Sequence, residues 1–283
     1  LAVTEQESGF RADPAVPGLG AIARKEIARR ADEAGVPRLA LRAALALNSP
    51  DGRSYAERID AVKTERQLSE IFENFIGMVP LGKTFFESRN PVRTGGPMQV
   101  GIAFAEAQAK ARPYPYPVRE SIRREVFTRR GGLYFGAAHL LADVAPYDQP
   151  IYRFADFNAG RLASRNAAFQ NALAVASGLP LALDGDLLPR GSGAPRGETE
   201  RAAGTMAGRL GLGEPAIRRD LEKGEDADFA NTALYERVFA YAERLDKRAL
   251  PRAVLPRIDL HSPKFTRKLT TEWFARRVDE RHR

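Results

Sequence analysis

Apolar residues recur at helical spacing along most of the chain, and this pattern predicts a mainly α-helical protein. A helix is expected over 21–34, before a glycine suited to a C-cap, and another over 38–47, before Asn-Ser-Pro. Thr64 is a suitable N-cap for a helix over 64–76. Further helices are expected over 98–112, 132–144, 151–177, 198–211, 230–246 and 263–280. The sequence contains no internal repeat and no convincing run of alternating strands.

Segments rich in glycine and proline divide this helical pattern. RNPVRTGGP (89–97) predicts a loop, and the proline-aromatic run ARPYPYPVRE (111–120) predicts an extended segment packed on the surface. Gly, Pro, Ser and Arg dominate residues 189–197, which indicates a linker or a surface loop.

The composition allows a substantial core and makes a metal centre or a disulfide unexpected. Hydrophobic residues make up 43% of the 283 residues, and no apolar stretch approaches the ~20 residues that a spanning helix needs. Cysteine is absent, which excludes disulfides and thiolate ligands. His139, His261 and His282 are the only histidines, and no two have the spacing of a helical zinc motif. We therefore expect no metal and no cofactor.

The net charge of +8 favours acidic partners, namely nucleic acid, anionic lipid or an anionic cell-wall polymer. The basic residues are scattered as pairs within segments of mixed sign, and no recognition-helix or RNP-like pattern accompanies them. Nucleic acid is therefore not an expected partner. Charge alone does not choose between lipid and wall polymer.

Short stretches with candidate chemistry occur in a fixed order: QESGF at 6–10, GGPMQV at 95–100, YFGAAHLL at 134–141 and ADFNAG at 155–160. This order resembles the soluble, lysozyme-like lytic transglycosylases. Their signature is a Glu-Ser pair on a helix, a Gly-Leu-Met-Gln loop, and an Ala-Tyr-Asn-Ala-Gly turn after a Gly-Ala-x-Tyr-Leu-like helix. The resemblance covers about residues 1–175.

The resemblance implies a mainly α fold with a lysozyme-like core, of the goose-type and lytic-transglycosylase kind, over residues 1–182. A helical insertion would occupy about 14–92 of that core. Residues 183–197 would form a linker or surface loop, and residues 198–283 a helical C-terminal extension.

The same resemblance implies cleavage of peptidoglycan between N-acetylmuramic acid and N-acetylglucosamine. Glu7 would be the only catalytic residue, acting first as acid and then as base, while the N-acetyl group and the C6 hydroxyl of the substrate complete a transfer to a 1,6-anhydro sugar. Ser8 would orient the glutamate, and Phe157 and Asn158 would support it. The substrate groove would be lined by Gly96, Met98, Gln99 and Gly160.

Physical chemistry gives these residue types suitable roles. A glycosidic oxygen is protonated near neutral pH by a carboxyl group that still holds its proton, and burial against apolar groups raises a carboxyl pKa toward that range. Met98 and Phe157 would supply such a wall beside Glu7 if the motifs converge. Gln99 and Asn158 donate and accept hydrogen bonds, which suits a sugar hydroxyl or an N-acetyl group.

Other interpretations of these residues stay open. Glu7 taken alone is an ordinary solvated helix charge, and Asn158 with Gly160 is a common way to end a helix. Asp156 adjoins the motif and is expected to cap a helix or to pair with Arg153, rather than to act as a second catalytic carboxylate.

Departures from the family pattern favour an alternative function. Phe157 stands where the family usually has a tyrosine, Pro97 replaces the usual leucine, and about 85 residues separate the first motif from the second. The alternative is a catalytically impaired envelope lipoprotein that binds peptidoglycan or acts as a scaffold.

The whole sequence also resembles an uncharacterised family of bacterial envelope lipoproteins, through the stretches PGLGAIARKEI, SPDGRSYAERID and YRFADFNAG. This resemblance implies a periplasmic or outer-membrane location, with a lipid anchor expected upstream of Leu1. The expected partners are peptidoglycan strands and, as a further possibility, anionic lipid or another envelope protein.

Overall fold

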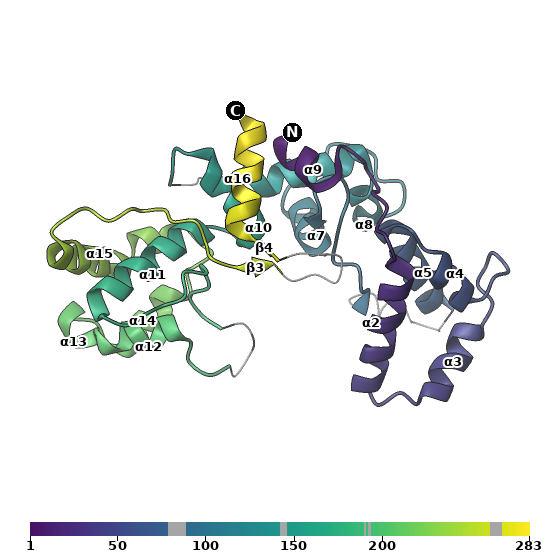
Figure 1. The fold of residues 1–283 in the computed structure, drawn as a ribbon, viewed down its shortest axis with the longest axis horizontal. Coiled ribbons are helices and arrows are strands. Elements are labelled where there is room, and N and C mark those ends of the chain that lie inside the picture. Colours follow the sequence, from purple (N-terminus) through teal and green to yellow (C-terminus); the bar gives the residue numbers. More distant parts are fainter. Residues whose placement is uncertain (79–88, 142–145, 190, 192–193, 261–267) are drawn as a thin grey trace. The chain divides into compact units, whose positions relative to one another are not determined.

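The structure, a computed structural model, describes residues 1–78, 89–141, 146–189, 191, 194–260 and 268–283. Helices dominate these residues, so the predicted mainly α class is confirmed (Figure 1). The chain divides into two compact units, which we call the first unit (Val3–Ala138) and the second unit (His139–Arg283). The predicted core, insertion, linker and extension concern relatedness to another family, and they stay predictions.

The elements before the boundary are short helices and one small hairpin. They are α1 (Ala2–Ser8), α2 (Leu19–Glu33), α3 (Arg38–Ala46), α4 (Tyr55–Ala61), α5 (Glu65–Gly77), β1 (Thr94–Gly95), β2 (Val100–Gly101), α7 (Ile102–Ala111), α8 (Ile122–Val126) and α9 (Arg129–Leu141). The boundary between the units falls inside α9.

Capping boxes start two neighbouring helices of the first unit. The Ser54 hydroxyl accepts from the Glu57 amide at the start of α4, and the Thr64 hydroxyl accepts from the Gln67 amide at the start of α5. In both helices the N3 side chain bonds back to the N-cap amide. The predicted N-cap at Thr64 is therefore confirmed, whereas α4 was not predicted because its seven residues give too short a periodic pattern.

The helix predicted over 98–112 is wrong in its first turn. Residues 94–101 form an antiparallel hairpin in which Thr94 pairs with Gly101 and Gly95 with Val100, and α7 starts only at Ile102. Gly96 and Gln99 have φ values of 75° and 51°, which a right-handed helix does not allow. The Gln99 amide donates to the Gly96 carbonyl at 3.1 Å and closes the turn.

Aromatic rings hold the core of the first unit together. Tyr55 meets Phe75 edge to face with ring centroids 5.1 Å apart, and Tyr114 stacks on Phe135 at 5.0 Å. The proline-aromatic segment is therefore anchored to α9 by Tyr114, while Tyr116 in the same segment stays exposed.

The second unit contains α10 (Pro150–Ala159), α11 (Ala163–Ser177), α12 (Glu198–Thr205), α13 (Ala207–Leu210), α14 (Glu214–Leu221), the 3-10 helix η2 (Ala227–Asn231), α15 (Ala233–Asp246), β3 (Asp259–Leu260), β4 (Leu269–Thr270) and α16 (Thr271–His282). The short strands β3 and β4 pair antiparallel before α16. The first residues of the helix predicted over 263–280 lie outside the described residues.

A continuous helix over 151–177 was predicted, and this prediction is wrong because the chain breaks between α10 and α11. Gly160 has φ 131° and ψ 161°, a region that is essentially accessible only to glycine. Leu162 then adopts a left-handed conformation, with φ 57°, before α11 starts. The interpretation of Gly160 as a helix stop is confirmed.

Helix α11 is the centre of the second unit. It packs along α15, and its Phe169 ring meets Phe229 edge to face at 5.0 Å and lies parallel to Tyr235 at 5.9 Å. Buried residues occur all around α11, so its sequence shows little amphipathic pattern. Helix α16 packs along α10, the helix that carries the ADFNAG stretch.

Arg165 is a fully buried cation in α11, with 1% of its surface exposed. Its Nη1 donates to the Asp226 carbonyl at 2.7 Å and its Nη2 to the Gly224 carbonyl at 2.6 Å. The guanidinium also lies 5.1 Å from the centre of the Phe229 ring. Burial lowers its pKa to about 10, so it remains charged at neutral pH.

We predict that Arg165→Met lowers the free energy of unfolding by about 2–4 kcal/mol, because the carbonyl groups of Gly224 and Asp226 each lose one buried, charged donor. Arg237 is a matched control, since its Nη1 also donates to two carbonyls, those of Leu210 and Gly211, but at the surface. Arg237→Met should cost less than about 1 kcal/mol. Equal losses in urea unfolding would contradict the assignment.

Candidate functional site

The serine of the Glu-Ser pair joins α1 to the 94–101 hairpin. The Ser8 hydroxyl donates to the Pro97 carbonyl at 2.8 Å, and the Thr4 carbonyl lies 3.1 Å from the same hydroxyl. Gly9 ends the helix in a left-handed conformation, so Glu7 stands in its last turn and is half-buried. The structure thus brings together two motifs that are far apart in the sequence.

The hairpin packs directly against the backbone of α9. Pro97 and Met98 are buried, and they face Gly132 and Gly136, which lie one helical turn apart. A Cβ atom at Gly136 would lie 2.7 Å from Met98 Cβ, and one at Gly132 would overlap Pro97 and lie 2.6 Å from the Val126 carbonyl oxygen. The GGPMQV loop and the GGLYFGAAHLL helix therefore form one closely packed body.

The groove residues predicted in this loop have different surroundings. Gly96 is buried with φ 75°, and a Cβ there would overlap the Val126 carbonyl. Met98 is only 3% exposed, which makes it part of the wall rather than a surface contact. Gln99 is half-buried, and its side-chain amide spans the turn: Nε2 donates to the Gly96 carbonyl at 3.4 Å and Oε1 accepts from the Thr94 hydroxyl at 3.3 Å.

The remaining predicted residues belong to the second unit. Phe157 is half-buried, and its ring meets His139 edge to face at 5.0 Å. Asn158 Oδ1 accepts from the Thr271 hydroxyl at 3.1 Å, so the side chain of Asn158 is tied to the start of α16. Gly160 ends α10. Helix α9 contributes to both sets, through Gly136 to the first and through His139 to the second.

Asp156 is a titratable group whose state could not be inferred from sequence. Its Oδ1 accepts from the Ser164 amide at 2.7 Å, so it caps α11, as one of the open interpretations expected. Burial raises its pKa to about 7, although the hydrogen bonds from Ser164 and the nearby charge of Arg165 act in the opposite direction. The chain thus keeps a carboxyl group partly protonated at neutral pH, four residues before Gly160.

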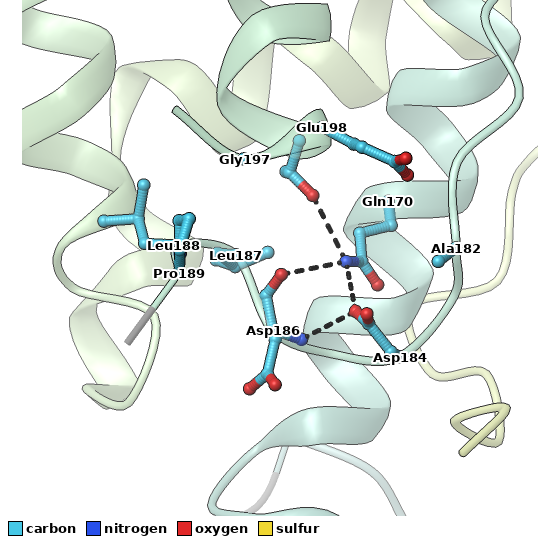
Figure 2. Close-up of a pocket in the computed structure, with 10 residues that line it drawn as sticks. Gln170, Ala182, Asp184, Asp186, Leu187, Leu188, Pro189, Gly197 and Glu198 are labelled. Atoms are coloured by element: carbon cyan, nitrogen blue, oxygen red, sulfur yellow. Dashed lines mark hydrogen bonds between the residues drawn. The ribbon is translucent and has the colours of Figure 1, made fainter. Parts of the chain in front are cut away.

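A pocket of about 270 Å³ lies in the second unit between α11, the loop after it and the start of α12 (Figure 2). The Gln170 amide is its centre: the two N–H groups of Nε2 are shared among Asp184 Oδ1 at 2.8 Å, the Asp186 carbonyl at 3.2 Å and the Thr199 hydroxyl at 3.2 Å. The bonds drawn in Figure 2 join Gln170 to Asp184, the Asp186 backbone and Thr199, so they tie α11 to the loop after it and to the start of α12. No motif in the sequence predicted this pocket, because its residues come from α11, the loop after it and the start of α12.

Two further properties bear on function. In the part of the chain that the structure describes, no group of three or more His, Cys, Asp or Glu residues could hold a metal ion. Among the same residues, no helix has both the length and the apolar character needed to cross a membrane.

Comparison with known proteins gives a family and a relative. The sequence model of a family described as "Protein of unknown function (DUF1615)" matches residues 1–283. The chain is 57% identical over 281 residues to "Uncharacterized protein YaiW" of Escherichia coli (strain K12), which covers 99% of this chain and 76% of that protein. No solved structure gives a significant match.

The packing of the hairpin on α9 gives a stability prediction. Gly132→Ala should lower the free energy of unfolding by about 1–3 kcal/mol, because the added methyl meets rigid atoms of Pro97 and the Val126 carbonyl. Gly204, in α12, has open space around its Cα, so Gly204→Ala should be neutral or stabilising by up to about 1 kcal/mol. Urea unfolding of both variants measures this. An unchanged free energy of unfolding in Gly132→Ala would show that the hairpin is not held against α9.

The raised pKa of Asp156 predicts a pH dependence of stability. Between its ordinary value of 3.8 and about 7, the folded protein holds a proton that the unfolded chain has released, so stability falls as pH rises through this window. Asp156→Asn keeps the acceptor for the Ser164 amide and removes the titration. We expect the variant to gain up to about 4 kcal/mol over the wild type at about pH 8, and little at about pH 4.

Glu243→Gln is a control in which stability should change with pH in the opposite direction. The Leu250 amide and Arg252 lower the pKa of Glu243, so its contribution to stability is present at neutral pH and is lost as pH falls through the folded-state pKa. Its variant should therefore be less stable than the wild type at neutral pH and approach it in acid. Asp156→Asn would contradict the assignment if its gain did not change between about pH 4 and about pH 8.

Proposed function

The chain belongs to the DUF1615 family, and from this starting point we propose that it is a peptidoglycan lytic transglycosylase with a lysozyme-like core, in which Glu7 is the single acid and base. The observation that carries the proposal is the hydrogen bond from the Ser8 hydroxyl to the Pro97 carbonyl. It joins the Glu-Ser helix to the Gly-Gly-Pro-Met-Gln loop, which is the pairing of motifs that such an enzyme uses.

The proposed reaction needs no water and no second carboxylate. Protonated Glu7 gives its proton to the oxygen that links C1 of N-acetylmuramic acid to N-acetylglucosamine, and the C1–O bond breaks with help from the N-acetyl carbonyl. The C6 hydroxyl of the muramic acid then attacks C1 while the Glu7 carboxylate takes the hydroxyl proton. The glutamate ends the cycle protonated, and the product is a 1,6-anhydro sugar.

The surrounding residues have supporting roles in this proposal. The buried side chain of Met98 anchors the loop, and the half-buried amide of Gln99 is the group of the loop suited to a sugar hydroxyl or an N-acetyl group. Gln99 has a left-handed backbone, with φ 51°, and strained conformations of this kind cluster at ligand sites. In the second unit, Asn158 is the amide suited to a sugar, and its Oδ1 accepts from the Thr271 hydroxyl. The activity implies a location in the bacterial envelope, in contact with the wall.

A second candidate function is a peptidoglycan-binding or scaffolding protein without turnover. It is favoured by Phe157, whose ring packs on the edge of His139 and has no hydroxyl to offer to the catalytic carboxylate. In this case Gln99 and Asn158 would still bind sugar, while Glu7 would not transfer a proton.

We predict that the protein incubated with peptidoglycan sacculi releases anhydromuropeptides, detected by mass spectrometry. Glu7→Gln should lower their rate of formation by about 100-fold or more, since removing a general acid typically costs this much. Glu5→Gln, on the same helix and exposed, is the matched control and should retain activity. Retained activity in Glu7→Gln would remove Glu7 from the mechanism.

The same experiment separates the two candidates. Sacculus binding by all three proteins, without anhydro products from any of them, would exclude the enzyme and support the scaffold. Neither products nor binding would exclude both.

A further inference from the structure

Helix α3 exposes an apolar face, unlike an ordinary surface helix. Within α3, all of whose residues the structure describes, none is buried. Leu39 is 79% exposed, and Leu47 and Val36 at the two ends of the helix are 51% and 39% exposed. Surface helices normally turn apolar residues inward and polar residues outward. An apolar outward face therefore calls for a partner.

The two sides of α3 differ in what they contact. At 100° per residue, Leu39, Ala43 and Ala46 share one stripe, and all of them are exposed. Leu45 lies on the opposite side and packs against the core of the first unit. We call the outward set, Val36, Leu39, Ala43, Ala46 and Leu47, the α3 patch.

Arginines border the α3 patch along one edge. Arg38 and Arg42 are four residues apart and project beside Leu39. The side chain of Arg38 is 85% exposed, and its guanidinium makes one long ion pair, with the Asp32 carboxylate at 3.8 Å. Among the described residues, Arg42 has no ion-pair partner, whereas Arg29 and Arg30 on the preceding helix pair with Glu26. Both polar side chains of α3 are thus exposed cations, and the one ion pair among them, that of Arg38, is long and exposed and therefore weak.

We propose that the α3 patch docks onto the surface of an anionic lipid bilayer. Leu39 and Leu47 would enter the boundary between headgroups and acyl chains, and Arg38 and Arg42 would bind lipid phosphates through bidentate hydrogen bonds. An apolar stripe with a basic edge and no acidic side chain within α3 matches this environment in both polarity and charge. A sugar strand would need hydrogen-bonding groups that the patch lacks. The inference is independent of Glu7 and goes beyond the proposed enzymatic function.

Vesicle binding by the full chain tests the proposal. The protein should co-sediment with vesicles of equimolar phosphatidylglycerol and phosphatidylcholine, and at least about fivefold more weakly with pure phosphatidylcholine. Leu39→Glu should weaken binding by about tenfold or more, and Arg38→Gln with Arg42→Gln should remove most of the preference for phosphatidylglycerol. The matched controls are Leu245→Glu, at a leucine 52% exposed on α15, and Arg219→Gln, at an exposed arginine on α14. Both controls should bind like the wild type.

A fluorescent probe locates the contact. Because the chain contains no cysteine, Leu39→Cys and Leu245→Cys each provide one labelling site for an environment-sensitive dye. Vesicles should shift the emission of the dye at position 39 to shorter wavelength and leave the dye at position 245 unchanged. Equal responses at both positions, or no binding by the wild type, would overturn the proposal. So would a wild-type dimer that Leu39→Glu turns into a monomer in light scattering, since the patch would then be an interface between copies of this chain.

Discussion

The close approach of the 94–101 hairpin to α8 and α9 is the constraint on which the candidate site of the first unit depends. Glycines at 95, 96, 132 and 136 remove the side chains that would otherwise separate these backbones. Pro97 and Met98 fill the space, and the Pro97 carbonyl stays available to accept from Ser8. A glycine-rich sequence that looks like a flexible loop therefore forms one of the more rigid contacts of this unit, and it fixes the position of α1.

The sequence predicts helices well where helix-specific signals exist and poorly where the backbone turns left-handed. Thr64 predicts the start of α5, because it belongs to a capping box that can be recognised from residue types alone. The residue types of Gln99 and Leu162 do not predict their left-handed backbone. Positive φ is uncommon at non-glycine residues, and here the conformation is imposed by tertiary packing. The first turn of the helix predicted from Met98 failed for this reason, whereas the continuity predicted across Gly160 failed although this glycine is itself a recognisable helix stop. The candidate site shows the same limit: its residue types are readable, but the contact between Ser8 and Pro97 and the burial of Asp156 arise only in the folded chain.

Helix α11 shows why a pattern of apolar residues is an incomplete description of a core. Arg165, Asn166 and Gln170 are polar, yet each is at most 3% exposed. Asn166 Nδ2 donates to the Gly185 and Gly224 carbonyls, so the side chains of α11 complete the hydrogen bonding of two loops that have no regular structure of their own. Buried polar groups are tolerated when all of their hydrogen bonds are made, and such a network rigidifies the segments that it connects. The loops around Gly185 and Gly224 are therefore held by α11 rather than by their own sequences.

Charge, like hydrophobicity, has to be considered locally before it indicates a partner. The net charge of +8 does not distinguish a wall polymer from a lipid, and many arginines are paired with carboxylates on their own helix, as Arg276 is with Glu272. Such pairs present no net charge to a partner, and they contribute little to stability. Arg38 and Arg42 differ because their helix contains no acidic residue and its outward face is apolar. Two exposed cations beside exposed leucines are a more specific signal than the excess of basic residues over the whole chain, since this combination matches both layers of a membrane surface.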